Sequence, residues 1–358
     1  MEKTRIYLNC NKKTGREVSS RPVNLGKENM KKKNLGNTNI SVTPVAMGVD
    51  TVGPSKHARA FADGARVVRY AAEQGINFFD ASDNFIDYRY LKKALNDLAP
   101  EFSQNNLQYP VIASKSLASD FDGMSKAIDN CRSALNLDQI DIFMMMDVTQ
   151  PDFENRRGAW ECLQDAKAKG HIKAAGISTS HADAVAAAAG KEGVDVVFSL
   201  LNFQGRGILK GEGEGEKEDM EDAVAAIAEN GAGVYAMHVL GGGKLAEFYT
   251  KALGYAMDVK GVSGIVLGLG CRQDIDDAVS YFEGRMPEDY MPDLSKPQLR
   301  NRIYVDRSLC TKCGACVKYC TNSTYSFGED GFPFADTKKC IRCGFCLPVC
   351  PVQALLFL

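Results

Sequence analysis

Short apolar runs alternate with longer segments of helical periodicity through the middle of the chain. Eight of these runs are apolar at successive positions and rich in β-branched residues, a pattern that predicts strands buried on both faces. The expected strands cover residues 44–49, 76–82, 111–116, 140–148, 172–178, 194–202, 234–239 and 264–270.

Helical periodicity fills the intervals, for instance at residues 58–74 and 154–169. Each of these two segments is followed by a glycine, Gly75 or Gly170, which is the residue favoured just beyond a helix end. Eight strand–helix units over about 250 residues have the size and order of a (β/α)8 TIM barrel. An open doubly wound sheet is the alternative, but the G-x-G-x-x-G turn that it favours after an early strand is absent. We therefore predict an α/β barrel, with its chemistry at the C-terminal ends of the strands.

The composition is that of a globular protein, with 45% apolar and 25% charged residues among 358. No apolar run approaches the roughly 20 residues that a membrane span requires, so we expect no membrane span. The first thirty residues are basic and polar, so we expect no secretory signal and a cytoplasmic location. In that compartment the twelve cysteines would be reduced, which favours ligands over disulfides.

Charge divides the chain into three blocks. Residues 1–33 carry ten basic against three acidic side chains, residues 34–299 carry 25 against 38, and residues 300–358 carry eight against four. The basic N-terminal arm lacks the aromatic residues that stack on bases, so we expect no nucleic-acid partner. We expect instead a solvated tail, or one that docks on an acidic partner or on the acidic barrel.

Eight of the twelve cysteines lie in the last fifty residues and repeat one spacing, C-x2-C-x2-C-x3-C. Paired C-x-x-C motifs can also hold zinc, but zinc gives no reason for a triple at two-residue steps with a fourth cysteine three further on. The spacing therefore favours iron–sulfur clusters, which exchange single electrons. The remaining cysteines lie far apart, and three of them fall in periodic segments where we expect buried apolar packing: Cys10, Cys131, Cys162 and Cys271.

This C-terminal segment resembles bacterial two-cluster ferredoxins along its whole length. In such proteins the fourth cysteine of each run binds the other cluster. The resemblance implies two [4Fe–4S] clusters and a small α+β domain. The implied ligand sets are Cys310, Cys313, Cys316 and Cys350 for one cluster, and Cys340, Cys343, Cys346 and Cys320 for the other. The expected domains are an N-terminal extension (1–33), the barrel (34–284), a linker (285–300) and the ferredoxin-like domain (301–358).

The middle section is similar to the aldo-keto reductase family in six ordered motifs. They are the opening hairpin at 35–42, the run G-I-N-F-F-D-A-S at 75–82, A-S-K at 113–115, G-I-S at 176–178, L-G-G-G-K-L at 240–245 and the turn containing Gly268 and Gly270. Aldo-keto reductases with a C-terminal two-cluster ferredoxin form a subgroup that this chain resembles. The family reduces carbonyls with NADPH, using a tyrosine as proton donor, a Lys–Asp pair beside it and a histidine that orients the carbonyl.

Carried over by position, the resemblance matches Asp80 and Lys115 to the family's Asp and Lys. The proton-donating tyrosine falls on Phe85 and the histidine on Met146, and neither replacement can donate a hydrogen bond. The retained pair is therefore equally consistent with catalysis and with a structural ion pair. Four other residues near the predicted strand ends are candidates for a substitute acid: Asp83, Tyr88, Asp147 and His238.

The nicotinamide site that the resemblance implies is also altered. The family's Ser-Asn becomes Ser178-Thr179, its strand-six Gln becomes Phe198, and its stacking aromatic becomes Met237. The basic residue for the 2′-phosphate falls on Asp274, and the adenine-side Glu-Asn becomes Asp277-Ala278, so we expect weak NADP(H) binding. The cofactor-binding candidates that remain are Ser178, Gly268, Gly270 and Arg272.

Three functional hypotheses follow. The first is an iron–sulfur oxidoreductase of anaerobic type, in which the clusters exchange electrons with a barrel-bound substrate or a redox partner protein. The second is a non-catalytic electron-transfer subunit of a larger redox complex. The third is an NADPH-dependent carbonyl reductase with structural clusters, and the loss of the tyrosine and histidine counts against it. The acidic stretch 211–222 is expected to be a solvated loop that caps the next helix, or a partner-docking site.

Overall fold

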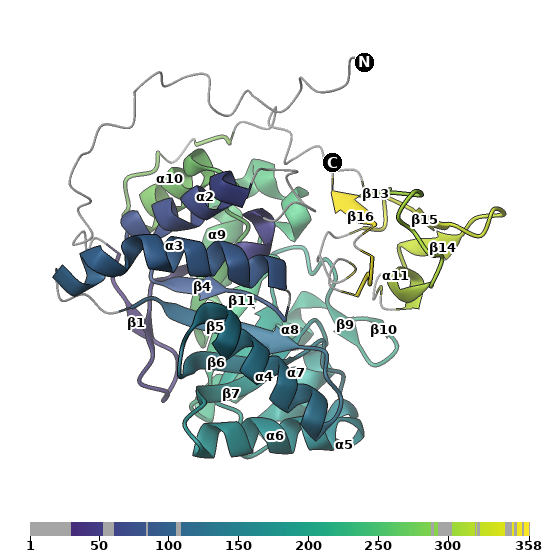
Figure 1. Ribbon diagram of the computed structural model, residues 1–358, viewed down its shortest axis with the longest axis horizontal. Helices are drawn as coiled ribbons and strands as arrows, with labels where there is room; N and C mark the ends of the chain where they lie inside the picture. Colours follow the sequence, from purple (N-terminus) through teal and green to yellow (C-terminus); the bar gives the residue numbers. More distant parts are fainter. Residues whose placement is uncertain are drawn as a thin grey trace.

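Eight parallel strands close into a barrel in the computed structural model (Figure 1), as the strand pattern predicts. The order around the barrel is β11-β12-β3-β4-β5-β6-β7-β8, and β8 pairs with β11 to close it. The strands are β3 (Val45–Gly48), β4 (Phe78–Asp80), β5 (Val111–Ser116), β6 (Ile140–Met146), β7 (Ile172–Thr179), β8 (Val196–Leu200), β11 (Gly233–Met237) and β12 (Val262–Leu267). The structure describes residues 30–52, 61–83, 85–104, 109–287, 290–292, 303–318, 320, 323–340, 346, 349–352 and 354–357.

Helices surround the barrel and bury one face each against it. Gly75 and Gly170 adopt the left-handed conformation (φ +90° and +75°), which confirms the expected helix ends. The helices are α2 (Phe61–Glu73), α3 (Phe85–Gln104), α4 (Phe121–Leu135), α5 (Asp152–Asn155), α6 (Arg157–Ala168), α7 (Ala182–Ala189), α8 (Lys217–Glu229), α9 (Tyr249–Asp258) and α10 (Arg272–Phe282), with 3-10 turns at Val49–Val52, Gly241–Gly243 and Ala246–Phe248.

The helical segment expected over residues 154–169 is present but divided, because the chain breaks between α5 and α6 at Arg156. The guanidinium of Arg156 is buried and donates to the carbonyl oxygens of Met146 (2.9 Å) and Ala118 (3.0 Å). These bonds join the ends of neighbouring barrel strands. The periodicity of the sequence carries no signal for them, since they depend on tertiary contacts.

The acidic stretch 211–222 is only partly the loop that was expected. It contains half of a short hairpin, β9 (Leu209–Lys210) with β10 (Gly213–Glu214), and α8 already begins at Lys217. The expected capping role is confirmed, because Glu216 and Asp219 form a reciprocal capping box at the start of α8. The opening hairpin of the barrel is also confirmed, as β1 (Lys33–Asn34) pairs with β2 (Ser41–Val42).

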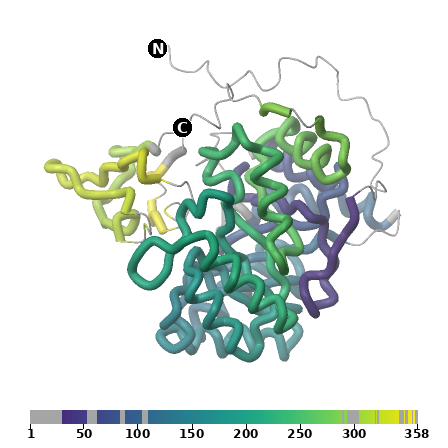
Figure 2. Tube along the Cα trace, turned by 180° about the vertical axis from the view of Figure 1, so that it is seen from behind, coloured from purple at the N-terminus to yellow at the C-terminus, as the bar shows by residue number. Residues whose placement is uncertain are grey.

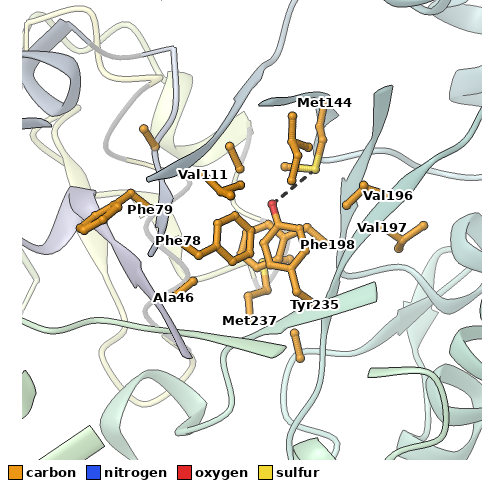
Figure 3. Close-up of a cluster of buried hydrophobic side chains, with 14 of the residues drawn as sticks. Ala46, Phe78, Phe79, Val111, Met144, Val196, Val197, Phe198, Tyr235 and Met237 are labelled. Carbon is orange, nitrogen blue, oxygen red and sulfur yellow. Dashed lines mark hydrogen bonds between the residues drawn. The ribbon is translucent and has the colours of Figure 1, made fainter. Parts of the chain in front are cut away.

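Aromatic rings fill the centre of the barrel, as Figure 3 shows. Phe198 of β8 stacks on Tyr235 of β11 with ring centroids 4.4 Å apart, and Phe78 of β4 meets Tyr235 edge-on at 5.0 Å. Position 176 of β7 requires glycine, because a Cβ at this position would lie 1.9 Å from the carbonyl oxygen of Val196 on the neighbouring strand. The interior is therefore a packed core, and any ligand site has to lie above it.

A small separate fold follows the barrel. It contains β13 (Ile303–Val305) paired with β16 (Leu355–Phe357), the helix α11 (Ala315–Lys318), and β14 (Tyr325–Phe327) paired with β15 (Pro333–Ala335). Figure 2 shows this module beside the barrel, and Lys244, in the turn after β11, donates to the Lys338 carbonyl oxygen at 3.0 Å. Among the described residues, no helix has the length and apolar character needed to cross a bilayer.

Candidate functional site

A buried ion pair lies at the C-terminal end of the barrel strands. Asp80, the last residue of β4, accepts a 2.5 Å hydrogen bond from Nζ of Lys115 on the adjacent strand β5. The same Nζ atom donates to the Ala81 carbonyl oxygen at 2.9 Å and lies 5.0 Å from the centroid of the Phe198 ring. Burial raises the pKa of Asp80, while the ammonium of Lys115 opposes that shift. The structure thus brings together the two catalytic candidates that the resemblance matched.

Tyr235 joins this pair and was not anticipated from the sequence. Its hydroxyl is fully buried and donates to the second carboxylate oxygen of Asp80 at 3.2 Å. Burial raises the pKa of Tyr235 well above its ordinary value, and the charge of Asp80 raises it further, so the phenol stays protonated. The sequence did contain a signal for Tyr235. Alternate side chains of a strand share a face, so Tyr235 and Met237 of β11 lie on the same, inward face of the barrel.

The positions of the family's other catalytic groups hold no proton donor. Phe85 is the first residue of α3, and Met146 is the last residue of β6. Met146 pairs in register with Ser178 of β7, so both side chains face the barrel interior near its mouth. Ser178 is fully buried, and its Oγ atom has no hydrogen-bond partner among the described residues. Apolar sulfur-containing and aromatic side chains therefore replace polar ones around the Asp80–Lys115 pair.

The dinucleotide side of the site does not fit NADP(H). Asp274 caps the N-terminus of α10, where its Oδ2 atom accepts the N–H groups of Gly270 (3.0 Å) and Cys271 (3.1 Å). A phosphate at a helix N-terminus needs such N–H groups, and a carboxylate beside it repels it. The guanidinium of Arg272 stacks over the ring of Tyr70 at 4.5 Å. Gly268 is exposed beside Thr51, directly after the end of β12, and Ser178 faces the barrel interior near the mouth.

Two of the four candidate acids are engaged elsewhere. The hydroxyl of Tyr88 is buried and shares a 2.6 Å hydrogen bond with Ser114, which lies on the outer face of β5 because its neighbour Lys115 faces inward. Asp83 accepts a hydrogen bond from the Ser116 hydroxyl at 3.0 Å, and burial raises the pKa of its carboxyl. Tyr88 therefore does not face the mouth.

The other two candidates, Asp147 and His238, follow β6 and β11 directly and both adopt a left-handed backbone conformation (φ +55° and +61°). One carboxylate oxygen of Asp147, Oδ1, is buried and accepts no hydrogen bond from the described residues. Burial raises the pKa of Asp147 to about 6, with Arg156 opposing and Asp152 adding to the shift. The carbonyl of His238 accepts the Gly241 N–H at 2.7 Å and so begins the glycine turn.

In the C-terminal module the first cysteine loop lies at the surface. Cys313 is exposed and Cys310 is half-buried, whereas Cys316 is buried. Burial raises the pKa of Cys316 to about 11, and the nearby thiols of Cys350, Cys310 and Cys313 add to the shift. The structure thus places Cys350, from the end of the second run, beside the first triple.

The described cysteines of the second run are more deeply buried than those of the first loop. Cys340 and Cys346 are buried with Tyr325, whose hydroxyl donates to the sulfur of Cys346 at 3.4 Å, and Cys320 packs against the same small core. Cys343 lies outside the described residues, as does Cys10. The described cysteines are all free thiols, and Cys131, Cys162 and Cys271 are buried, as expected for apolar packing.

Several features of the module fit an iron–sulfur cluster. Backbone N–H groups donate to the sulfurs of Cys310, Cys320 and Cys350 at 3.2–3.4 Å, a pattern that stabilises thiolates around iron. Gly314 has φ +74°, and the Phe327 ring leaves no room there for a Cβ. Among the described residues no three Cys, His or acidic side chains converge on a single metal ion.

Comparison with known proteins matches two families along the chain. Residues 44–259 match the aldo/keto reductase family, and residues 309–355 match a 4Fe-4S dicluster domain. The chain belongs to the aldo/keto reductase family. It carries a 4Fe-4S dicluster domain at its C-terminal end.

The relatives are distant. A 6-dehydroglucose reductase of Novosphingobium aromaticivorans is 28% identical over 172 residues, which cover 43% of this chain and 53% of that protein. The chain thus spans about half the length of this curated relative. An aldo-keto reductase of Pseudomonas aeruginosa superposes with a TM-score of 0.56 at 17% identity, over 72% of this chain and 95% of that one. One from Bacillus halodurans, in its holo form, has a TM-score of 0.57 at 15% identity, over 74% and 98%. These structures show the shared fold alone.

Proposed function

We propose that this aldo/keto reductase family member exchanges electrons between its ferredoxin module and a molecule bound at the barrel mouth, without NADP(H). The observation that carries the proposal is the Asp274 carboxylate in the first turn of α10, which accepts the N–H groups of Gly270 and Cys271 just before the helix and would repel a dinucleotide phosphate at that end. With no hydride donor accommodated, the cysteine module is the source of electrons that the chain itself provides.

The ligand sets proposed for the module are those expected from the spacing. Cys310, Cys313, Cys316 and Cys350 would hold one [4Fe–4S] cluster, and the observed approach of Cys350 to the first triple supports this set. Cys340, Cys343, Cys346 and Cys320 would hold the other cluster, and the small core of the module contains described cysteines of both sets. When bound, such clusters supply or accept one electron at a time. The chain's own residues then have to position the electron-accepting molecule and manage its protons.

The contact between Lys244 and Lys338 supports exchange within one chain. Lys244 follows the glycine turn after β11, at the end of the barrel where the Asp80–Lys115 pair lies, and Lys338 precedes Cys340 by two residues. The second cysteine run is thereby held at the active end of the barrel. A redox partner protein would meet the more exposed first loop, which contains Cys313.

A second function, an electron-transfer subunit with an idle barrel, is favoured by one observation. Lys115 already contacts Asp80, the Ala81 carbonyl oxygen and the Phe198 ring, so the pair satisfies itself without a substrate. Purification would separate the two functions, since a subunit should co-purify with stoichiometric partner proteins and an enzyme should not.

The proposed function is tested by anaerobic titration of the purified chain with NADH, NADPH, reduced flavin and reduced ferredoxin. We expect about eight irons and eight acid-labile sulfides per chain, as two cubes require. We also expect reduction by the one-electron donors but not by NADPH, followed by visible and EPR spectroscopy. Zinc or no metal in material prepared without oxygen, or fast reduction by NADPH, would contradict the proposal.

A further inference from the structure

The loop that follows β8 carries an arginine whose guanidinium is not bound by the rest of the described chain. Arg206 has no side-chain hydrogen bond, ion pair or aromatic contact among the described residues, although its Nε atom is buried. Every other described arginine has at least one interacting partner. Buried polar groups in proteins normally have a partner, so the acceptor for this guanidinium is expected from a bound molecule.

The backbone of Arg206 is fixed by one buried amide. Asn202 is fully buried, and its Nδ2 group donates to the Arg206 carbonyl oxygen at 2.9 Å. Its Oδ1 atom accepts the Arg206 N–H at 3.0 Å. The flanking residues Gly205 and Gly207 have φ values of +65° and +83°, a region that glycine adopts readily. The loop thus holds the backbone of Arg206 in place while the guanidinium stays uncommitted, as in a preorganised binding residue.

The side chain of Arg206 lies at the C-terminal face of the barrel, against the turn after β11. A Cβ atom added to Gly241 in that turn would lie 3.5 Å from Cδ of Arg206, an ordinary van der Waals distance. The loops after β8 and β11 both start at the carboxyl ends of barrel strands, the edge on which barrels place their sites. Arg206 therefore reaches from the first of these loops to the second.

The same two strands surround the buried ion pair. β8 contributes Phe198, whose ring centroid lies 5.0 Å from Nζ of Lys115. β11 contributes Tyr235, whose hydroxyl donates to Asp80. The loop that bears Arg206 is thus attached to the sector of the barrel that holds the pair.

The charges at this place favour an anion. The barrel is acidic overall, with 25 basic against 38 acidic side chains in residues 34–299, so an anion needs a local cation to bind here. No acidic side chain in the described part of the chain pairs with Arg206. Lys244, which follows the glycine turn, donates to the Lys338 carbonyl oxygen at 3.0 Å and adds a second cation beside the turn.

The turn itself is a poor seat for a phosphate group. Phosphates are usually bound by several backbone N–H groups of a glycine-rich loop. Here the N–H groups of Gly241, Gly243 and Leu245 already donate to carbonyl oxygens within the turn, at 2.7, 2.8 and 3.1 Å. A carboxylate can instead be bound by one planar guanidinium through two parallel N–H···O hydrogen bonds. The contacts therefore favour a carboxylate as the partner of Arg206.

We infer that Arg206 binds the carboxylate group of the molecule that is held at the barrel mouth. The inference rests on the proposed function and deepens it, because it assigns a chemical class, the organic acids, to the molecule that exchanges electrons with the cysteine module. It concerns recognition alone. Two hydrogen bonds form between the guanidinium and the carboxylate, and no covalent bond changes.

The test is equilibrium binding to the iron-loaded full-length chain, measured by isothermal titration calorimetry at neutral pH. The probes are three carboxylates, each compared with its amide, and inorganic phosphate: benzoate with benzamide, phenylacetate with phenylacetamide, and succinate with succinamide. Arg206→Met keeps an unbranched stem and removes the guanidinium, and Arg206→Lys keeps the charge without the planar fork. The control is Arg285→Met, which removes an exposed arginine that pairs with Glu283 beyond the end of α10.

We expect at least one of the carboxylates to bind, and its amide to bind at least about tenfold more weakly. That carboxylate should bind Arg206→Met about 30-fold more weakly than wild type and Arg206→Lys about tenfold more weakly. Arg285→Met should keep the wild-type affinity. The melting temperature of ligand-free Arg206→Met should not fall, because a guanidinium without a partner adds no hydrogen bond to the folded state.

Wild-type affinity in Arg206→Met, or equal binding of acids and amides, would overturn the inference. Failure of all three carboxylates to bind, tighter binding of phosphate, or a lower melting temperature of ligand-free Arg206→Met would overturn it too. These results would leave the proposed function standing, because electron exchange through the clusters does not require a carboxylate. Absence of the clusters, or fast reduction by NADPH, would contradict the proposed function and leave the carboxylate-binding result intact.

Discussion

Tyr235 is one of two side chains that donate hydrogen bonds to the buried carboxylate of Asp80, and burial and Lys115 act more strongly on the pKa of that carboxylate. Asp80 is fully buried, so its ionised form depends on two donors, Nζ of Lys115 on Oδ2 and the Tyr235 hydroxyl on Oδ1. Removal of either donor leaves a buried charge without its partner, which is one of the costly changes in a protein interior. Tyr235 thus supports the Asp80–Lys115 pair from the packed interior of the barrel, on the side away from the barrel mouth.

The first prediction concerns Tyr235→Phe, which keeps the ring stack and removes the hydroxyl. We expect the free energy of unfolding at pH 7 to fall by about 1–3 kcal/mol, the usual cost of an unsatisfied buried group. The variant raises the pKa of Asp80 further above its ordinary value. The loss should therefore shrink as the pH falls towards that value, where Asp80 is protonated in the folded and unfolded states alike.

The measurement is urea denaturation of the two proteins at pH 7 and pH 4.5. Tyr88→Phe is the matched control, because Tyr88 is equally buried but its hydroxyl contacts the neutral Ser114. Its destabilisation should be the same at both pH values. Equal pH dependence in the two variants would show that Tyr235 does not act through Asp80.

At the scale of elements, the N-terminus of α10 bears on the proposal that the barrel does not use NADP(H). The helix begins with a capping box in which Asp274, in the first turn, accepts the N–H groups of Cys271 and Gly270 just before the helix. The carboxylate is favoured there by the helix dipole and by the unpaired backbone donors, which are the two features that would attract a phosphate. A phosphate at this end of the helix would therefore meet the negative charge of Asp274.

The second prediction is that NADPH binds weakly, with a dissociation constant above the micromolar range, measured by fluorescence titration. Asp274→Ser keeps a capping side chain and removes the negative charge, so it should bind NADPH more tightly than wild type. Asp276→Ser is a control on the same helix, because Asp276 contacts the Tyr70 hydroxyl and no helix N–H group. Micromolar binding by wild type would show that the cap does not exclude the cofactor.

The sequence predicts those elements that depend on local features, and it does not predict those that depend on contacts between remote residues. The strands and the glycine helix ends were predictable, because buried apolar runs and left-handed glycines are local features. The break at Arg156 was not, since the guanidinium bonds carbonyl groups on β6 and in the segment after β5 that are remote in the chain. Tyr235 was missed for a similar reason, because its partner Asp80 lies 155 residues away.

The candidate site shows the same division. Asp80 and Lys115 could be predicted from motifs, and the structure joins them. The sequence gave equal reason to consider Asp147 and Tyr88 as candidate acids. The structure distinguishes them, because Asp147 has a left-handed backbone conformation and the Tyr88 hydroxyl is hydrogen-bonded to Ser114. The ligand set that crosses between the two cysteine runs stays a prediction, with Cys343 outside the described residues.

At the scale of the whole molecule, the barrel and the cysteine module have separate cores. The barrel core runs from Met30 to Val279, and the module packs around Tyr325, Cys316 and Leu355. Small domains of this kind depend on metal ligation, because so short a chain buries little apolar surface. The barrel has no such need.

The third prediction follows from these separate cores. Cys313→Ala should lower the iron content by about half, since one of two cubes loses a ligand, and leave the thermal unfolding of the barrel unchanged. Cys162→Ala is the control, because this buried cysteine belongs to α6, and its replacement should leave the iron content unchanged. Iron analysis and circular dichroism measure the two quantities. Loss of all the iron with collapse of the whole chain would contradict separate domains.

The cap on α10 also bears on whether this barrel could be given pyridine-nucleotide chemistry. Replacing Phe85 with tyrosine would supply a phenol at the position that the family resemblance assigns to the proton donor, yet the Asp274 carboxylate would still lie in the first turn of α10. If the proposed function is correct, hydride transfer from NADPH would therefore need changes in at least two distant parts of the chain. An engineer who wants a pyridine-nucleotide enzyme from this scaffold should begin with the helix and only afterwards supply the acid.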